Sequence, residues 1–210
     1  MTGVSASAEL FARAAELDAD LVLVHHGLFW KGPPKPLDPA GKRRLQLLFD
    51  HDMALAAYHL PLDGHQEHGN AALIAAGLGA TAWRPWGGRP PTGVVAELPA
   101  MSDDELRQRV STLTGRAPLA FLEGPREVRT LGILTGAAAH AFDDAIEEGL
   151  DAFLTGEPIE RVMTRARETG THFLAAGHYA TETFGVRRLG ELLEREHGVR
   201  HVFVDVPNPV

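Results

Sequence analysis

The sequence contains no cysteine, and this absence is the first constraint on its chemistry. Disulfides and thiolate metal sites are excluded, so any metal must bind to nitrogen and oxygen ligands. The chain also lacks an apolar run long enough to span a bilayer, and it begins with no recognisable signal peptide. We therefore expect a cytoplasmic location.

Strongly basic stretches are missing as well. Lys and Arg number 20 against 28 Asp and Glu, which gives a formal net charge of -8. Nucleic acids and anionic membranes attract clustered positive charge, so we expect neither as a partner. The sequence has no glycine-rich phosphate loop, no GxSxG nucleophile elbow and no HExxH zinc helix. We expect a small-molecule substrate and no organic cofactor.

Short apolar runs alternate with helical periodicity along the 210 residues. Residues 21–27 are typical of a strand buried on both faces, and a Pro-rich loop follows at 31–39. Ser102 and Glu105 form a capping box that predicts the start of a helix. Residues 83–92, rich in Trp, Pro and Gly, are interpreted as a loop between lobes. This alternation predicts an α/β fold with mixed sheets.

Part of the sequence occurs twice. At an offset of 131 residues, four positions match: Phe11, Ala14, Asp20 and Leu23 correspond to Phe142, Ala145, Asp151 and Leu154. At an offset of 119 residues, five more match: Leu55, Ala56, Ala57, His59 and Asp63 correspond to Leu174, Ala175, Ala176, His178 and Glu182. We predict two pseudo-repeated, intertwined α/β lobes. Residues 1–92 form the first, and 93–210 form the second, which holds the repeat at about 131–190.

Both copies end in a histidine followed four residues later by a carboxylate, as His59 with Asp63 and as His178 with Glu182. Ligands of open α/β sheets gather at the carboxyl ends of strands, and imidazole and carboxylate groups bind divalent metals. Glu182 is suited to bridge two ions if a helix follows Gly177, because positions i and i+4 share a helix face. The alternative is a core histidine with a helix-start carboxylate, and the repetition argues against it.

The doublet His25–His26 directly follows the predicted strand and is a further pair of candidate ligands. Adjacent residues of a strand point to opposite faces, so one metal receives both imidazoles only if the strand has ended. Gly27 indicates that it has. Otherwise each imidazole binds a different metal. The structural alternative is a core histidine beside a surface one.

The remaining candidates are weaker. His59 is either a ligand or an outer partner of a ligand. Glu157 matches His26 in the second copy and is a candidate base or substrate contact, with a helix-start acid as the alternative. His65 and His68 are interpreted as loop or helix-start residues. Five histidines receive no role: His51, His140, His172, His197 and His201.

These motifs resemble those of the Nif3-like family, the GTP cyclohydrolase 1 type 2 homologues. The matching strings span residues 3–210 in the family's order: GVSAS, VHHGLFWKG, HLPLDGH followed by GN, LTGE, AAGHYATE and VDVPNPV. The resemblance implies two related α/β lobes, a dinuclear metal centre between them and a homohexamer. It also implies the metal ligands, which are His25, His26, Asp63, His178 and Glu182. Family members carry a leading segment with an Asn-Gly-Leu motif that this sequence lacks, and a late start assignment, a truncated sequence and a real loss of this edge of the first lobe are the alternatives.

The resemblance and the ligand types together predict a dinuclear metal-dependent hydrolase that uses a metal-activated water. Two divalent ions per chain are expected, and the ligands suit Zn, Fe or Mn equally. His59 and Glu157 are candidate catalytic groups or outer partners of the ligands. The alternative is a non-enzymatic metal-binding, metal-delivery or scaffold protein. A water-accessible site with an open coordination position favours the hydrolase, and a closed site favours the alternative.

Overall fold

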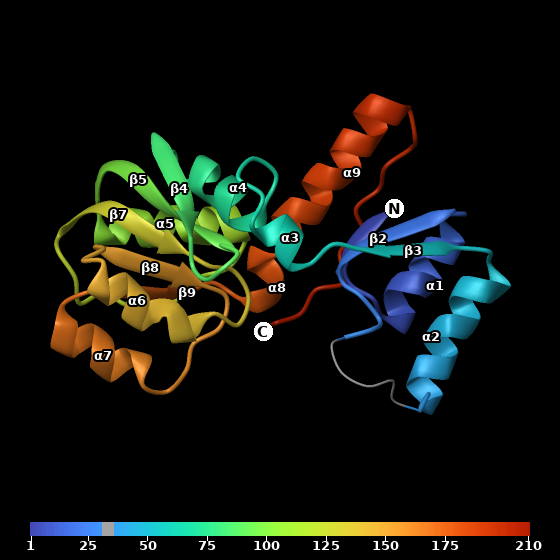
Figure 1. Ribbon diagram of the computed structural model, residues 1–210, viewed down its shortest axis with the longest axis horizontal. Helices are drawn as coiled ribbons and strands as arrows, with labels where there is room; N and C mark the ends of the chain where they lie inside the picture. The colour runs from blue at the N-terminus through green and yellow to red at the C-terminus, as the bar shows by residue number, and fades with distance from the viewer. Residues whose placement is uncertain (31–35) are drawn as a thin grey trace. The chain divides into compact units, whose positions relative to one another are not determined.

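The computed structural model describes residues 1–30 and 36–210, so part of the predicted Pro-rich loop lies outside the described residues. The chain forms two compact units (Figure 1). Unit 1 consists of Met1–His59 and Gly185–Pro207. Unit 2 consists of Leu60–Phe184 and Asn208–Val210. The chain thus leaves unit 1 after His59 and returns to it after Phe184.

Unit 1 is built on a three-stranded parallel sheet in the order β1-β2-β3. Its strands are β1 (Thr2–Ser5), β2 (Leu21–His26) and β3 (Ala54–Ala57), connected by α1 (Ala8–Glu16) and α2 (Pro39–Asp50). The Ser7 hydroxyl accepts a hydrogen bond from the Leu10 amide at 3.1 Å and so fixes the start of α1. The segment around Phe203 extends the sheet by a parallel bridge to Thr2.

The two faces of β2 are covered differently. Val22 and Val24 pack in one core cluster with Phe11 of α1 and Leu48 of α2. Leu23 points to the other face, and it lines a cavity together with residues of helix α9 (Thr183–His197). Since side chains alternate along a strand, His25 shares the face of Leu23 and is fully buried.

Unit 2 is built on a six-stranded mixed sheet in the order β4-β5-β7-β8-β9-β6. Of the three strand pairs at the centre of this sheet, two are parallel, namely β7 with β8 and β8 with β9. The strands are β4 (Ala82–Trp86), β5 (Gly93–Ser102), β6 (Leu119–Phe121), β7 (Glu127–Ile133), β8 (Ala152–Thr155) and β9 (His172–Ala175).

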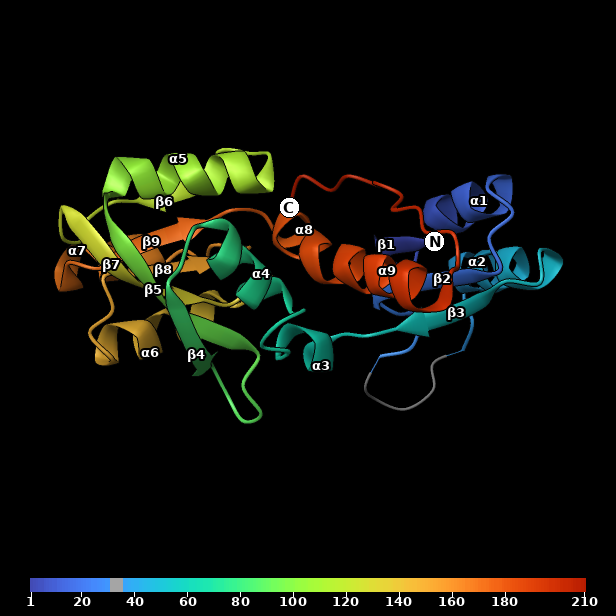
Figure 2. The same ribbon diagram turned by 90° about the horizontal axis from the view of Figure 1, so that it is seen from above.

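Helices cover both faces of this sheet, as Figure 2 shows for α5 on one side and α6 on the other. One core cluster joins the sheet to α4 (Asn70–Gly77) and α5 (Asp103–Thr114). The other joins it to η1 (Ala139–Ala141), α6 (Phe142–Glu147) and α7 (Val162–Thr169). Two single-turn helices, α3 (Leu60–Asp63) and α8 (His178–Thr181), complete the unit among the described residues.

The boundary predicted at residues 92/93 differs from the division of the structure. That position lies in the hairpin of β4 and β5, where Trp86 pairs with Gly93. Residues 83–92 are therefore part of unit 2 and not a loop between lobes. The sequence misled because Pro85 sits in β4, an edge strand, where a missing amide donor does not interrupt the sheet.

Strand registers confirm the internal repeat. Thr2 pairs with Leu23 in unit 1, and Ile133 pairs with Leu154 in unit 2, which reproduces the offset of 131 residues in both strands. In the third strands the registers of the two copies differ by one residue, since Leu23 pairs with Ala56, whereas Leu154 pairs with Leu174 and Thr155 pairs with Ala175. The β1-β2-β3 sheet and the β7-β8-β9 segment are therefore two copies of one βαβαβ element. The predicted α/β class with two sheets is confirmed.

Candidate metal centre

Three histidines of unit 1 gather at the carboxyl ends of β2 and β3. His25 and His26 are the last residues of β2, and His59 follows β3 by two positions. The ring centroids of His25 and His59 lie 4.8 Å apart, and those of His26 and His59 lie 5.3 Å apart. The doublet was predicted directly after the strand, whereas the structure places both histidines within β2 as its last two residues.

The Nδ1 atoms of the doublet are already engaged. His25 Nδ1 lies 2.9 Å from the Tyr58 carbonyl oxygen. Because a carbonyl only accepts, Nδ1 must carry the proton, and the lone pair of the neutral ring is then on Nε2. His26 Nδ1 lies 3.0 Å from the Ser5 hydroxyl. For His25 this leaves Nε2 as the atom with the lone pair, which is the usual arrangement of a metal-binding histidine.

In unit 2, His178 lies between two carboxylates. It begins α8, directly after Gly177, whose φ of 96° lies in the left-handed region that glycine tolerates. Its Nδ1 donates to Glu157, and its Nε2 lies 3.1 Å from Glu182 Oε2. The expected helical turn after Gly177 is present, and it brings the i and i+4 side chains together.

The two carboxylates give His178 a high proton affinity. The hydrogen bond to Glu182 is the largest contribution, and with the Glu157 hydrogen bond and the two negative charges it raises the pKa of His178 to about 9, against the opposing effect of burial. Glu182 itself is only 3% exposed. A carboxylate buried to this extent requires compensating positive charge, which the imidazolium supplies and which a bound cation could supply instead.

Asp63, the third of the five predicted ligands in chain order, is also buried, at 5% exposure. Its Oδ1 accepts hydrogen bonds from the Asn70 amide at 2.8 Å and from the Thr135 hydroxyl at 3.3 Å. Thr135 precedes Gly136, which lies against Glu182 and His178. The carboxylate of Asp63 is thus held by neutral donors next to the loop that borders the His178–Glu182 pair.

Glycine makes this crowding possible. A Cβ added at Gly136 would clash with Glu182 Oε1 and lie 3.1 Å from His178 Nε2. A Cβ at Gly156 would lie 2.7 Å from the His178 Cα. The loops that contain these glycines are also bonded to each other, since the Gly156 amide donates to the Gly136 carbonyl at 2.9 Å. The absence of side chains at Gly136 and Gly156 therefore leaves the space that Glu182 and His178 fill.

The donor types fit a divalent metal. Unit 1 supplies imidazole groups, and unit 2 supplies an imidazole and buried carboxylates, with neither sulfur nor a lysine among the predicted ligands. Such nitrogen and oxygen sets suit Zn, Fe or Mn. Within unit 1 the candidate ligand atoms of His25, His26 and His59 all lie within 4.8 Å of one another. The prediction of a metal-binding His/Glu set is supported, whereas the number and identity of the ions stay predictions.

Several groups that orient these side chains were not singled out from the sequence: Ser5, Tyr58, Thr135 and Gly136. Tyr58 acts through its backbone, which no residue-type pattern reveals. Asn70 was noted only as part of a matching GN string. Glu157, in contrast, was a candidate, and the structure places it on His178 as a hydrogen-bond partner.

Three histidines outside the predicted ligand set, His65, His68 and His172, have contacts that stabilise the surrounding loops. His172 accepts from the Gly124 amide at 3.1 Å and contacts the Pro125 carbonyl at 2.8 Å, which fastens that loop. His65 and His68 stack on each other at 4.7 Å. His65 also accepts from the backbone amide of His68 at 3.1 Å, so it stabilises its own turn.

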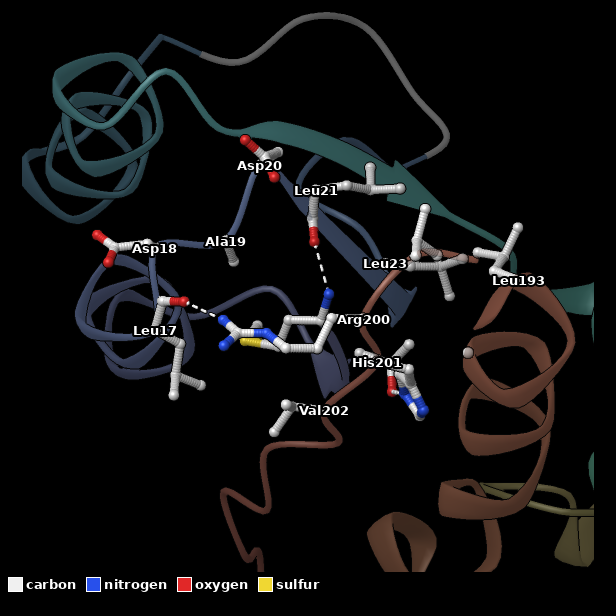
Figure 3. A pocket seen from close by; sticks show the side chains of 14 residues that line it. Leu17, Asp18, Ala19, Asp20, Leu21, Leu23, Leu193, Arg200, His201 and Val202 are labelled. Atoms are coloured by element: carbon white, nitrogen blue, oxygen red, sulfur yellow. Dashed lines mark hydrogen bonds between the residues drawn. The ribbon is translucent and has the colours of Figure 1, made fainter. Parts of the chain in front are cut away.

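A cavity of about 310 Å³ lies elsewhere in unit 1 and contains none of the predicted ligands (Figure 3). Its wall includes Leu23, Leu193 and Val202, so it is mainly apolar. Arg200 in this wall is hydrogen-bonded within the protein. It donates to the Leu17 carbonyl at 2.7 Å, as a dashed line in Figure 3 marks. His201 bonds the Thr2 hydroxyl at 2.9 Å, and burial lowers its pKa.

Comparison with known proteins is extensive. The family model Duf34/NIF3 (NGG1p interacting factor 3) matches residues 1–209. A Pseudomonas aeruginosa protein named GTP cyclohydrolase 1 type 2 homolog is 41% identical over 212 residues, which cover 100% of this chain and 84% of the relative. An Escherichia coli K12 protein of the same name is 40% identical over 216 residues, with 100% and 84% covered.

Two solved structures with similar sequences superimpose closely on this chain. A structure described as protein ybgI, unknown function, superimposes with a TM-score of 0.91 at 41% identity, covering 100% of this chain and 84% of that one. The protein TTHA1606 from Thermus thermophilus also gives a TM-score of 0.91, at 36% identity and the same coverage. In the described residues, 1–30 and 36–210, no helix has the length and apolar character needed to cross a membrane.

Proposed function

The chain belongs to the Duf34/NIF3 family, and from that premise we propose that it is a metal-dependent hydrolase with a dinuclear centre. The proposed ligands are the five that the sequence resemblance implies: His25, His26, Asp63, His178 and Glu182. Relatives are named GTP cyclohydrolase 1 type 2 homologs, so hydrolytic opening of a nucleotide ring is the reaction class to test first.

The observation that carries the proposal is the orientation of the imidazoles. His25 is held at Nδ1 by a backbone carbonyl, His26 by a hydroxyl and His178 by the Glu157 carboxylate. Each ring thereby directs Nε2 away from its anchor. Histidines that serve only to fill a core need no such common arrangement, whereas metal ligands almost always have it.

When bound, two divalent ions would lower the pKa of a water molecule and polarise a substrate oxygen. The protein's own groups would orient and balance this centre. Glu157 accepts a hydrogen bond from Nδ1 of His178, so Nε2 would be the atom of this ring that holds a cation. Asn70 and Thr135 hold Oδ1 of Asp63. Glu182, which lies against His178 Nε2, would be a carboxylate ligand.

The proposal is tested by reconstituting the full chain, after chelator treatment, with Zn²⁺, Mn²⁺ or Fe²⁺ and measuring metal content by mass spectrometry. Reconstituted protein is then screened against nucleotides including GTP, cyclic amides and phosphoesters. We expect about two ions per chain and metal-dependent turnover of at least one class. A Glu182→Gln variant should lose both, and an exposed control, Glu196→Gln, should lose neither.

Uptake of well under one ion per chain would end the metal proposal. Full uptake without hydrolysis of any substrate, together with rapid transfer of the metal to an apo-acceptor protein, would favour the metal-delivery alternative. The homohexamer, the small-molecule substrate and the cytoplasmic location stay predictions, and light scattering measures the first of them directly.

A further inference from the structure

We infer that the exposed indole of Trp30 is a stacking surface for the substrate, and that the substrate therefore carries a planar, conjugated heterocyclic ring. This inference rests on the proposed function, because it concerns the molecule that reaches the same centre. It goes beyond that function by naming the part of the substrate that unit 1 recognises. It also gives a role to a residue that is neither an implied ligand nor a candidate catalytic group.

Trp30 differs from the other two tryptophans of the chain. Trp86 is 6% exposed, and its Nε1 donates to Glu148 Oε1 at 3.0 Å. Trp83 is partly buried against a core cluster, and its Nε1 donates to the Gln66 carbonyl at 3.0 Å. Trp30 is 59% exposed. Tryptophan side chains are highly buried on average, so the position of this indole is not explained by packing in a core.

Contacts with two histidines nevertheless orient the Trp30 indole. Its ring centroid lies 5.1 Å from that of His59, at an interplanar angle of 86°, and 5.6 Å from that of His26, at 44°. His26 is itself held by the Ser5 hydroxyl, which lies 3.0 Å from its Nδ1. Edge-to-face and tilted contacts of this kind stabilise aromatic pairs. They restrict rotation of the indole, so its exposed surface is formed before a ligand arrives.

These contacts leave one face of the indole open. Rings at 86° meet edge to face, so His59 covers at most one face of Trp30. The indole also keeps more than half of its surface accessible, which coverage of both faces would not allow. A surface that is already oriented loses little conformational entropy on binding. Trp30 therefore offers a flat apolar face that is ready to receive another flat group.

The open indole lies beside groups that the proposed function uses. His26 is one of the implied ligands, and His59 is a candidate catalytic or outer group whose ring centroid lies 5.3 Å from that of His26. A ring stacked on Trp30 would thus have its edge next to these imidazoles. A substrate has to bring its reacting atom to this end of β2 and β3, so a contact with Trp30 would orient it there.

The chemistry of this position favours a planar heterocycle. Stacking on an aromatic side chain strengthens the binding of any nucleobase, because every base has a π-face. Cations also bind to indole faces, but a site that holds divalent ions repels them. An oxygen at the edge of a heterocycle is the kind of group that divalent ions polarise. The inferred class is therefore a conjugated ring with a carbonyl oxygen, as in a nucleobase.

The test compares probes with and without a base on the Zn²⁺-loaded full chain. GMP, UMP and ribose 5-phosphate are titrated by calorimetry, and we expect both nucleotides to bind more tightly than ribose 5-phosphate. Trp30→Ala should weaken the binding of both nucleotides by about 10- to 100-fold and leave that of ribose 5-phosphate unchanged. Trp30→Phe should recover most of the loss. Phe49→Ala, at another exposed aromatic residue of unit 1, is the matched control and should change neither.

The outcomes separate this inference from the proposed function. If the chain retains no metal or hydrolyses no substrate, but binds nucleotides through Trp30, the proposed function is wrong and the stacking surface stands. If metal uptake and hydrolysis are observed, but Trp30→Ala binds both nucleotides as the unaltered chain does, only this inference is wrong. It is also wrong if neither nucleotide binds more tightly than ribose 5-phosphate.

Two further measurements exclude other roles of Trp30. Mass spectrometry measures the metal content of each variant, and loss of metal in Trp30→Ala would show that the indole supports the ligands and does not bind the substrate. Light scattering measures the assembly. A smaller assembly with unchanged nucleotide affinity would identify the indole as a contact between copies of the chain and would overturn the inference. Unchanged metal content and assembly, with nucleotide affinity lost, support it.

Discussion

The two copies of the βαβαβ element share the order of their strands and the register of their first strand pair, but they differ in the side chains at their strand ends. In unit 1 the loops after the parallel strands present three imidazoles, His25, His26 and His59. In unit 2 the corresponding loops present His178 between Glu157 and Glu182. The copies therefore differ at the position of Glu157, where the first copy has the imidazole of His26 in place of a carboxylate. Duplication preserved the positions of the polar residues and changed their chemistry.

The position that shows this difference most clearly is Ser5 at the end of β1, which corresponds to Gly136 in the loop after β7. Ser5 and Gly136 correspond at the offset of 131 residues, since Ser5 pairs with His26 and Gly136 bonds the amide of Glu157. Ser5 uses its side chain to bond His26. Gly136 has no side chain, and the vacated space holds Glu182. A carboxylate in unit 2 thus requires a glycine where unit 1 has serine.

The largest effect is expected from making the copies alike at this position. Gly136→Ser places a Cβ against Glu182 Oε1 and forces a serine to adopt a φ of 66°. Displacement of Glu182 should weaken binding at the unit 2 ligands by on the order of 100-fold. Calorimetric titration with Zn²⁺ measures this change. Ser5→Gly is the reciprocal variant, and metal affinity reduced equally by both would contradict the proposed difference.

The next largest effect is expected from changing the groups that bond to Nδ1 of the imidazoles. Glu157→Gln replaces an anionic partner of His178 by a neutral one and should lower metal affinity by about 10- to 100-fold. Ser5→Ala removes a neutral partner of His26 and should cost only about 2- to 10-fold, because a neutral hydrogen bond contributes less. The measurement is competition with a chelator of known affinity. If Ser5→Ala lowered the metal affinity more than Glu157→Gln, the proposed difference between the two hydrogen-bond partners would be wrong.

These comparisons also explain what the sequence could predict. Strand and helix order, the cap at Ser102 and the repeated His-x-x-x-carboxylate were predictable, because each depends on residues close in the sequence or on fixed periodicity. The role of Tyr58 was not, since its carbonyl acts and its side chain is irrelevant. Nor was the hairpin at 83–92, because Pro and Gly in an edge strand resemble a loop until the pairing partner, Gly93 onward, is known.

Metal binding in the second copy should depend on pH through His178. Because the pKa of His178 is raised to about 9, metal-free protein carries an imidazolium there at neutral pH. Metal binding must release this proton, so affinity at the unit 2 ligands should rise by about tenfold per pH unit and level off near pH 9. Calorimetry at about pH 7.5 in buffers of different ionisation enthalpy should show release of about one proton from this group.

The raised pKa of His178 also determines whether the metal-free protein becomes more or less stable as the pH rises. A folded-state pKa above the unfolded value means that His178 stabilises metal-free protein fully below about pH 6.5, and that this contribution is lost as pH rises through about 9. Denaturant midpoints of metal-free protein should therefore fall across this interval. In Glu182→Gln the fall should shrink, because the largest cause of the shift is removed. A midpoint independent of both pH and this substitution would refute the assignment.

The smallest expected effect concerns the helix that follows the first strand in each copy. Ser7 has extended backbone angles and accepts the Leu10 amide, so Ser7→Ala should lower the free energy of unfolding by about 1 kcal/mol. In unit 2, Ala141 precedes α6 with φ −80° and ψ 3°, because η1 runs directly into that helix. A hydroxyl at Ala141→Ser is not placed to cap, so it should change stability by less than about 0.5 kcal/mol. Urea titrations followed by circular dichroism compare the two, and equal effects would show that the copies begin their helices in the same way after all.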